Sequence, residues 1–330
     1  MRCHFLRSRA WRVAAAGALT VCFADAACAQ AAYPNRQVTM IVPFAPGGGT
    51  DTGARIVAQK LSEKWGQPVV VENRGGAAGV IGVDMVAKAK PDGYTLLMGN
   101  IGTQSVNPAL YPKLPYDADH AFAPISLVAE LPLMMLVHAQ MPVKTPREFI
   151  AYAQAHPGQL SYSSSGAGGA MHLAAELFKS QSGTFILHVP YRGGGPAVAD
   201  LMSGQVQLTF ATVLEAIGQV KSGRIRAIAV TGDQRVTALP DVPTLSESGL
   251  PGFNSISWIG LLAPSGTPKE VVEKISVDVR AVLVDVAVKR RLVDLGAVPA
   301  GDTPVQFGKL IDDDRKRYTR LINEKHITIE

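Results

Sequence analysis

The sequence predicts an α/β protein of two lobes, each built on a mixed, largely parallel sheet. Predicted strands and helices alternate along the chain, which is the pattern of parallel sheets with crossover helices. Several strands are followed by glycine-rich loops that open helices, as expected at the ligand-binding edge of such sheets. About 300 residues follow a predicted N-terminal leader, and this length favours two domains.

Residues 1–29 read as a secretory signal peptide. Four arginines lie between residues 2 and 12, residues 13–23 are apolar, and Ala27-Cys28-Ala29 supplies small residues for cleavage. The apolar run is shorter than the ~20 residues that span a bilayer. An interfacial helix and a lipid anchor at Cys28 are the alternatives, but residues 25–27 lack the bulky apolar residue expected before an anchored cysteine. We therefore expect cleavage near Ala29 and a periplasmic product.

Removal of the leader changes the composition. All three cysteines lie in the leader, so the mature chain can form neither a disulfide nor a thiolate site. The leader also holds four arginines and one aspartate, so the formal charge falls from +5 to +2. No run of basic residues with interleaved aromatics follows, which argues against nucleic acid as a partner.

The first third of the mature chain reads as β-α-β-α-β. An apolar strand over 38–42 precedes a glycine-rich turn and a helix over 50–65, with Thr50 or Asp51 as its N-cap. A strand over 68–71, a helix over 79–89 and a strand over 94–98 follow.

The alternation continues to the end of the chain. A helix opens at Thr145-Pro146, where proline suits the first turn. The further expected strands are 133–137, 160–163, 185–189, 206–210, 225–230 and 259–263, and the further expected helices are 171–178, 196–202, 268–284 and 306–323.

Three strand-to-helix loops have the composition of anion sites. They are 44–51, 163–169 and 191–195, and all are rich in glycine. Glycine allows a ligand to approach the backbone closely, and a helix N-terminus presents unpaired N–H groups with a partial positive charge. One such loop alone would be read as a tight turn, but three in equivalent positions favour the binding of a carboxylate or phosphate.

The sequence does not match the common motifs of nucleotide-binding or catalytic sites. After Gly47 and Gly49 the third position of a dinucleotide loop is Thr52, and after Gly166 and Gly168 it is Met171. Neither a Gly-Lys-Ser/Thr phosphate loop nor a nucleophile elbow occurs, and the histidines are not spaced as metal ligands. We expect no cofactor, no metal and no enzymatic activity.

The sequence leaves the roles of three polar residues, Asp51, His172 and Arg192, open between alternatives. Asp51 is a general base or, as we favour, an N-cap or a group that orders the ligand. His172 and Glu176 read as an ordinary intrahelical pair, although His172 lies near the second loop. Arg192 clamps a carboxylate or is a solvated loop residue, and the sequence does not favour either.

Five segments together resemble the Bug family, the TctC-like extracytoplasmic receptors of tripartite tricarboxylate transporters. The resemblance implies a type II periplasmic-binding-protein fold that closes on its ligand like a flytrap. It places residues 30–131 and 255–330 in lobe 1 and residues 132–254 in lobe 2. The segments are PFAPGGGTD (43–51), SSGAGGAMHLAAELF (164–178), HVPYRGGGPAVADLMSGQVQLTF (188–210), LPDVPTLSESGLPGF (239–253) and LLAPSGTPKEVVEKI (261–275).

The resemblance also implies a ligand with at least one carboxylate, held mainly by backbone N–H groups and bridging water. Di- and tricarboxylates, acidic amino acids and aromatic carboxylates are the expected classes. In this sequence residues 211–214 depart from the family, where a polar or acidic residue and a proline are common. The implied ligand-binding residues are Phe44, Ala45, Pro46, Gly47, Gly48, Gly49, Thr50, Asp51, Gly102, Thr103, Gln104, Ser164, Ser165, Gly166, Gly168, Tyr191, Arg192 and Gly193.

The resulting hypothesis is a monomeric solute-binding protein that delivers a carboxylate to the membrane components of a tripartite tricarboxylate-type transporter. A sensor subunit for a signalling partner would share the binding step. A secreted hydrolase or lyase is the alternative from another class, and it would need Asp51, His172 and the serines at 163–165 to assemble.

Overall fold

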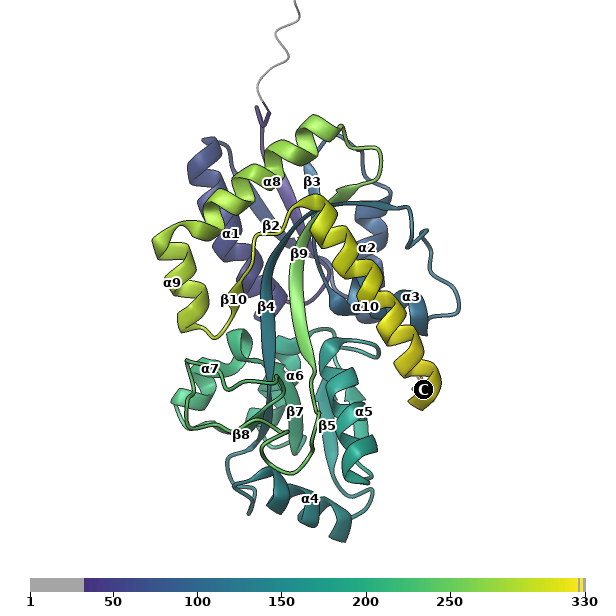
Figure 1. The fold of residues 1–330 in the computed structure, drawn as a ribbon, viewed down its shortest axis with the longest axis vertical. Helices are drawn as coiled ribbons and strands as arrows, with labels where there is room; N and C mark the ends of the chain where they lie inside the picture. Colours follow the sequence, from purple (N-terminus) through teal and green to yellow (C-terminus); the bar gives the residue numbers. More distant parts are fainter. Residues whose placement is uncertain (1–32, 326, 329–330) are drawn as a thin grey trace, which may run out of the picture.

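The computed structural model describes residues 33–325 and 327–328, so the predicted leader lies outside the described residues. Figure 1 shows two lobes stacked along the long axis of the molecule. The N-terminal third and the C-terminal segment share the upper lobe, and the middle of the chain forms the lower one.

The sheet of the first lobe has the strand order β2-β1-β3-β9-β4. Its outer strands β1, β2 and β3 pair in parallel, whereas β9 is antiparallel to both β3 and β4. The short β10 pairs with β4. The bounds are β1 Val38–Val42, β2 Val69–Asn73, β3 Thr95–Asn100, β4 Phe122–His138, β9 Ile256–Pro264 and β10 Val298–Pro299.

The second lobe repeats this arrangement with other strands. Its order is β6-β5-β7-β4-β8, in which β5 is parallel to β6 and β7, and β4 is antiparallel to β7 and β8. Mixed sheets are therefore confirmed in both lobes, with parallel pairing confined to one side of each sheet, β2-β1-β3 in the first and β6-β5-β7 in the second. The bounds are β5 Ser161–Ser164, β6 Leu187–Pro190, β7 Leu208–Thr212 and β8 Ile225–Val230.

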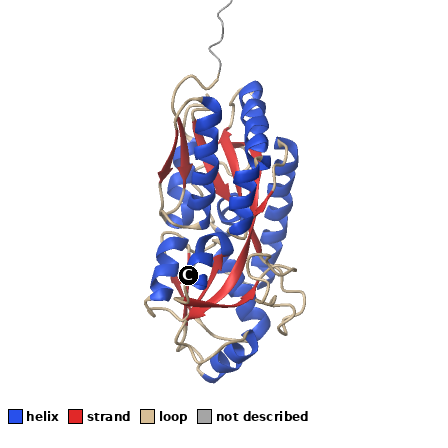
Figure 2. Ribbon diagram, turned by 90° about the vertical axis from the view of Figure 1, so that its left-hand side faces the viewer, coloured by secondary structure: helices blue, strands red, loops and turns tan. Residues whose placement is uncertain are grey.

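Helices cover both faces of the first sheet because successive strand residues face opposite sides. Met40 packs in a core beneath α1 and α8, whereas its neighbour Ile41 packs in a second core with α2 and α10. Figure 2 shows helices packed around the strands of both lobes. The bounds are α1 Gly49–Trp65, α2 Val80–Ala87, α8 Lys269–Val284, α9 Val286–Asp294 and α10 Pro304–Lys325, and in the second lobe α4 Pro146–Ala155, α5 Ala170–Ser182, α6 Gly194–Met202 and α7 Val213–Lys221.

Two strands run through the join between the lobes. The first half of β4 pairs with β9 as far as Pro132 opposite Ile256, and from Leu133 onward it pairs with β7 and β8. The lobe boundaries predicted at 131/132 and 254/255 lie at this change of partner and just before β9 begins. Two strands joining two compact units form a natural hinge.

Several elements differ from the prediction. The strand expected at 133–137 is only the end of β4, whose first half carries two register shifts and includes Pro124. Proline and irregular register weaken the strand signal there. The helices α7 and α9 were not predicted, and residues 102–104, expected in a loop, open a π-helical turn at Gly102–Val106 that continues into α3 (Asn107–Leu110).

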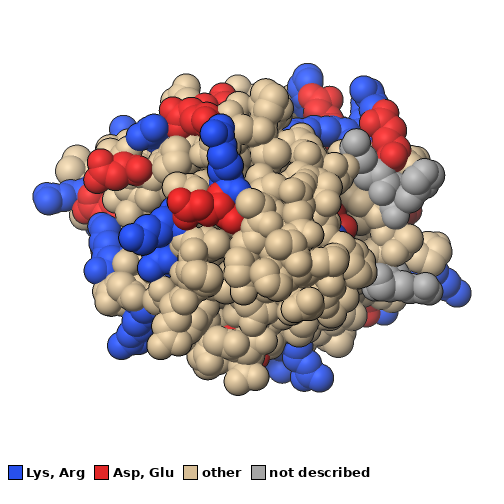
Figure 3. Space-filling view, turned by 90° about the horizontal axis from the view of Figure 1, so that it is seen from below, with Lys and Arg blue, Asp and Glu red and all other residues tan. Residues whose placement is uncertain are grey.

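The surface carries both signs of charge. Figure 3 views the molecule from the end of the second lobe, where basic and acidic side chains are interspersed around an uncharged centre. This face does not show the concentrated basic patch typical of nucleic-acid binding. Among residues 33–325, no helix combines the length and the apolar character that crossing a bilayer requires.

Candidate functional site

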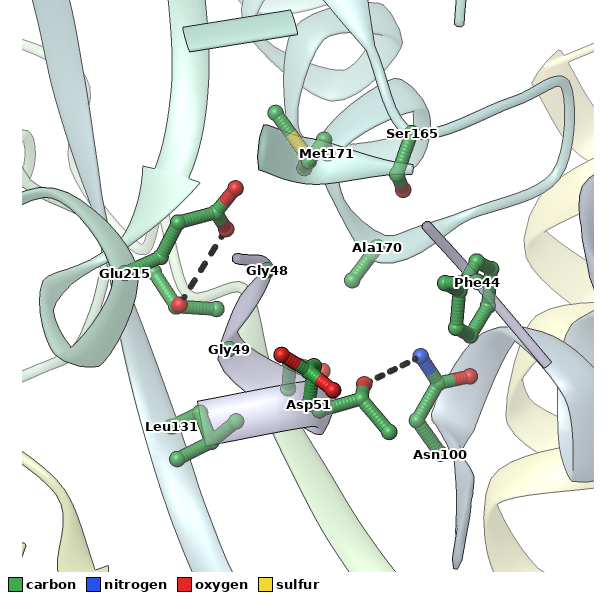
Figure 4. A pocket seen from close by; sticks show the side chains of 14 residues that line it. Phe44, Gly48, Gly49, Asp51, Asn100, Leu131, Ser165, Ala170, Met171 and Glu215 are labelled. Atoms are coloured by element: carbon green, nitrogen blue, oxygen red, sulfur yellow. Dashed lines mark hydrogen bonds between the residues drawn. The ribbon is translucent and has the colours of Figure 1, made fainter. Parts of the chain in front are cut away.

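A pocket lies between the lobes, where several helices begin. It is lined from the first lobe by the start of α1 and the end of β3, from the second by the starts of α5, α6 and α7, and from the shared strands by β4 and β9. Figure 4 shows these side chains around the cavity. The lining residues are Phe44, Gly48, Gly49, Thr50, Asp51, Asn100, Leu131, Ser165, Ala170, Met171, Gly194, Thr212, Glu215 and Ser257.

The four helices that begin at the pocket lack side-chain caps. Their N-cap residues Gly48, Gly169, Gly193 and Thr212 make no side-chain hydrogen bond to the first turn. By contrast, Thr145 caps α4 away from the pocket by accepting from the Glu148 N–H. Uncapped first turns leave N–H donors and a partial positive charge for an anion.

The first glycine-rich loop is held by Asp51. Its carboxylate accepts the Gly47 N–H at 3.0 Å, the Arg55 Nε at 3.0 Å and the Asn73 Nδ2 at 2.9 Å. Asn73 also donates to the Phe44 carbonyl, and Gly47 has a φ of 87°, which favours glycine. The N-cap of α1 is Gly48, so the prediction of Thr50 or Asp51 as the N-cap was wrong. Asp51 instead orders the loop, a role that the sequence analysis did not predict.

These donors also set the charge of Asp51. Burial alone would raise the pKa of its carboxyl group, but the hydrogen bonds from Arg55, Gly47 and Asn73 outweigh burial and lower the pKa below its usual value. Asp51 is therefore ionised at neutral pH and fully engaged, which leaves it poorly suited to act as a general base.

Asn100 joins the first loop to the π-helical turn. Its Nδ2 donates to the Thr50 hydroxyl at 3.3 Å, and its Oδ1 accepts the Thr103 N–H at 3.0 Å. Figure 4 shows Asn100 at the edge of the cavity beside Phe44. Gly102, Thr103 and Gln104 are buried behind it and do not line the pocket. Of this segment, the residue at the cavity is thus Asn100, two positions before the predicted loop.

Two histidines, the buried His172 and the half-buried His188, hold the second glycine-rich loop. The Gly168 N–H donates to His172 Nδ1 at 3.1 Å, and the Ser164 hydroxyl lies 2.6 Å from His188 Nε2. The two imidazole rings stack with centroids 4.4 Å apart, and His188 stacks in turn on Tyr162. His172 therefore positions the loop, a role that its sequence pairing with Glu176 did not reveal.

Both histidines are neutral at physiological pH. Burial lowers the pKa of His172 to about 4 and that of His188 to about 3. A neutral ring is also what the geometry requires, because His172 Nδ1 must be unprotonated to accept the Gly168 N–H.

The third loop contributes backbone rather than side chains. The Tyr191 hydroxyl donates to Asp200 on α6 at 2.5 Å, and the Arg192 side chain is exposed. The Arg192 carbonyl accepts the Ala45 N–H from the first lobe at 3.0 Å. Neither side chain lines the pocket in this closed arrangement, so the geometry favours the interpretation of Arg192 as a solvated residue.

Glu215 is the charged residue of the pocket that the sequence analysis missed. It lies in the first turn of α7, next to the segment 211–214 that departs from the family pattern, and its carboxyl group faces the cavity (Figure 4). Burial raises the pKa of Glu215 to about 7, although the Gly49 and Thr212 N–H groups and the Thr212 hydroxyl oppose this effect. An acidic residue in the first turn of a helix after β7 was the available signal.

The predicted site residues divide into two groups. Phe44, Gly48, Gly49, Thr50, Asp51 and Ser165 line the pocket. The others lie behind it or in the contacts between the lobes. These are Ala45, Pro46, Gly47, Gly102, Thr103, Gln104, Ser164, Gly166, Gly168, Tyr191, Arg192 and Gly193.

The groups required by the hydrolase alternative are not assembled. Ser163 donates to the Ala197 carbonyl, and Ser164 is fully buried against His188 rather than His172. Asp51 lies on the other lobe and is occupied by Arg55. Among the described residues, no group of three His, Cys, Asp or Glu side chains is arranged to hold a metal ion.

Comparisons with known proteins agree with this geometry. The family model described as "Tripartite tricarboxylate transporter family receptor" matches residues 53–327. BugT of Bordetella pertussis is 36% identical over 293 residues, which is 88% of this chain and 90% of BugT. A Rhodopseudomonas palustris protein solved with adipate is 36% identical with a TM-score of 0.88, covering 90% of this chain and 99% of the other.

MatC of R. palustris, solved with bound malate, is also 36% identical with a TM-score of 0.84, covering 88% of this chain and all of MatC. The periplasmic binding protein BugD is 36% identical with a TM-score of 0.87, covering 90% and 99%. The chain therefore belongs to the TctC family of tripartite tricarboxylate transporter receptors and has the two-lobed fold of its periplasmic binding proteins.

Proposed function

We propose that this protein captures a small carboxylate between its lobes in the periplasm and delivers it to the membrane components of a tripartite tricarboxylate-type transporter. The convergence of four uncapped helix N-termini on one pocket carries the proposal. A carboxylate bound there gains hydrogen bonds from backbone N–H groups and the favourable ends of the helix dipoles. Adipate and malate in two relatives are carboxylates of this kind.

Closure of the lobes completes the site in this proposal. The bodies that move are residues 30–131 with 255–330 and residues 132–254, and the hinge is in β4 and β9. Two of the hydrogen bonds that link the lobes lie at the glycine-rich loops: the Ala45 N–H to the Arg192 carbonyl at 3.0 Å, and the Tyr111 hydroxyl to the Ala167 carbonyl at 3.2 Å. A ligand that bridges the two glycine-rich loops stabilises this closed state.

The experiment is thermal unfolding of residues 30–330 against mono-, di- and tricarboxylates, amino acids and sugars, after refolding to remove any bound ligand. A ligand at a hundredfold excess over its Kd adds about 2.7 kcal/mol to the free energy of unfolding. We expect a rise of several degrees in Tm with one class of carboxylate. The uncharged amide of the same skeleton is the matched control, and an equal rise with that amide would contradict carboxylate capture.

Delivery to a transporter needs its own test. We expect that cells lacking this protein lose uptake of the ligand identified in vitro, and that the wild-type gene restores uptake. Normal uptake in the deletion strain would separate binding from transport and favour a sensor role. A monomer is the expected form, to be checked by light scattering with and without ligand.

A further inference from the structure

Glu215 places a buried acidic group in the pocket without a cationic partner. Its Oε1 is inaccessible to solvent and has no hydrogen-bond partner among the described residues. The donors that its carboxyl group does meet are all uncharged: the Gly49 and Thr212 N–H groups and the Thr212 hydroxyl, which lies 3.4 Å from Oε2. None of the fourteen described residues that line the pocket is Lys, Arg or His. A buried carboxyl with an unused oxygen is costly unless a partner satisfies it.

The other acidic residue of the pocket shows the contrast. Asp51 receives hydrogen bonds from Gly47, Arg55 and Asn73, and Arg55 also neutralises its charge. Asp51 can therefore serve the loop without any ligand. Glu215 has no equivalent of Arg55 among the described residues that line the pocket, which leaves its free oxygen available to a cationic group of a ligand.

The carboxyl group of Glu215 also occupies a position that a ligand carboxylate would favour. It lies so close to the start of α6 that a Cβ on Gly194 would overlap its Oε1. At the start of α1 it neighbours Gly48 and accepts a hydrogen bond from the Gly49 N–H. These are two of the uncapped N-termini. A second ligand carboxylate placed there would meet the like charge of Glu215 whenever that group is ionised, which disfavours binding.

A positive region remains on the opposite side of the pocket. Ser165, Ala170 and Met171 line the cavity at the uncapped start of α5, and Figure 4 shows them across the cavity from Asp51 and Leu131. A ligand carboxylate can bind at α5 while another part of the same ligand faces Glu215. The pocket thus offers donors at one side and an acceptor at another.

We infer that Glu215 makes this receptor select small amino carboxylates, whose ammonium group binds its free oxygen while their carboxylate binds at the start of α5. An ammonium group donates three hydrogen bonds and neutralises the Glu215 charge. A di- or tricarboxylate of the same size lacks that donor and brings another negative charge. This inference rests on the proposed function and narrows its ligand class.

The test is isothermal titration of matched ligand pairs that differ only by an amino group: alanine and propionate, 4-aminobutyrate and butyrate, aspartate and succinate, glutamate and glutarate. For at least one pair we expect the amino member to bind wild-type protein at least about tenfold more tightly, because only a site built for a donor rejects the analogue that lacks it. In Glu215→Gln, that preference should fall to within about threefold, mainly through weaker binding of the amino member.

Glu130→Gln is the matched control, because it removes a carboxylate from an exposed position on β4 outside the pocket. This variant should keep the wild-type preference. Equal or tighter binding of the des-amino members by wild-type protein would overturn the inference while leaving carboxylate capture intact. Failure of wild-type protein to bind any carboxylate, including those of the thermal panel, would overturn the proposed function as well.

Discussion

The two glycine-rich loops that face each other across the cleft are held by groups of opposite character. In the first lobe, an ionised carboxylate, Asp51, accepts the Gly47 N–H and is supported by Arg55. In the second lobe, a neutral imidazole, His172, accepts the Gly168 N–H and stacks on His188. Each acceptor lies four residues beyond the amide that it binds, in the helix that follows the loop.

The comparison shows that the same backbone hydrogen bond can be accepted by a carboxylate or by an imidazole, and that the two acceptors respond differently to pH. Asp51 requires deprotonation, and its lowered pKa keeps it ionised throughout the physiological range. His172 also requires deprotonation, but its unfolded pKa of about 6.5 lies within reach of mild acid. Acidification should therefore weaken the second loop before the first.

The largest effect on ligand affinity is expected from Asp51→Ala. The Gly47 amide, Arg55 and Asn73 would all lose their shared acceptor, so the first loop should no longer hold its N–H groups in place. We expect affinity for the identified ligand to fall about 100-fold and the free energy of unfolding to fall by about 2 kcal/mol. Calorimetry and urea unfolding would measure these changes.

Arg192→Ala is the comparison variant for that experiment. Because the Arg192 side chain is exposed and only its carbonyl contacts the first lobe, the affinity should change less than about threefold. A loss of affinity as large as that of Asp51→Ala would show that the Arg192 side chain clamps the ligand, in addition to the contact that its carbonyl makes with the first lobe.

The second prediction concerns pH. The pKa of His172 is about 4 in the folded protein and about 6.5 in the unfolded chain, so the unfolded chain binds more protons between these values. Stability from this group is fully present above pH 6.5 and is lost as the pH falls toward 4, by up to about 3 kcal/mol. Urea unfolding at pH 7.5, 6, 5 and 4 would measure the loss.

His172→Gln separates this residue from the other groups that titrate. Glutamine retains an acceptor for the Gly168 N–H but does not titrate. The stability of the variant should therefore fall less toward pH 4 than that of the wild type, and the remaining fall should come from the neighbouring His188. His120→Gln, at an exposed position, should keep the whole decline. An unchanged pH profile in His172→Gln would refute the assignment of neutral His172 as the support of the second loop.

The smallest effect tests the contact between the loops themselves. A Cβ at Gly195 on α6 would lie 2.6 Å from the Pro46 carbonyl of the first lobe, so Gly195→Ala should hinder closure without disturbing either core. We expect affinity to fall about tenfold, or about 1.4 kcal/mol, with little change in ligand-free stability. Gly218→Ala, which meets open space on α7, is the control. Equal affinities for the two variants would show that closure tolerates a wider gap.

The sequence by itself determined the alternating order of strands and helices and the positions of the glycine-rich loops. Alternating apolar runs and amphipathic helices are local patterns, and β1, α1, β8 and α8 follow from them within a few residues. The loops around Gly47 and Gly168 could be predicted because a positive φ next to a helix start demands glycine, and glycine is visible in the sequence.

The tertiary structure alone decided which groups meet at those loops. His188 lies 24 residues from Ser164, and Glu215 reaches the start of α1 only because β4 carries one lobe against the other. Hydrogen bonding, burial and a missing counter-charge depend on distances in space, which sequence spacing does not report. The glycine-rich loops at the helix starts were therefore predictable from local chemistry, whereas the position of Glu215 beside them emerged only from the packing of the two lobes.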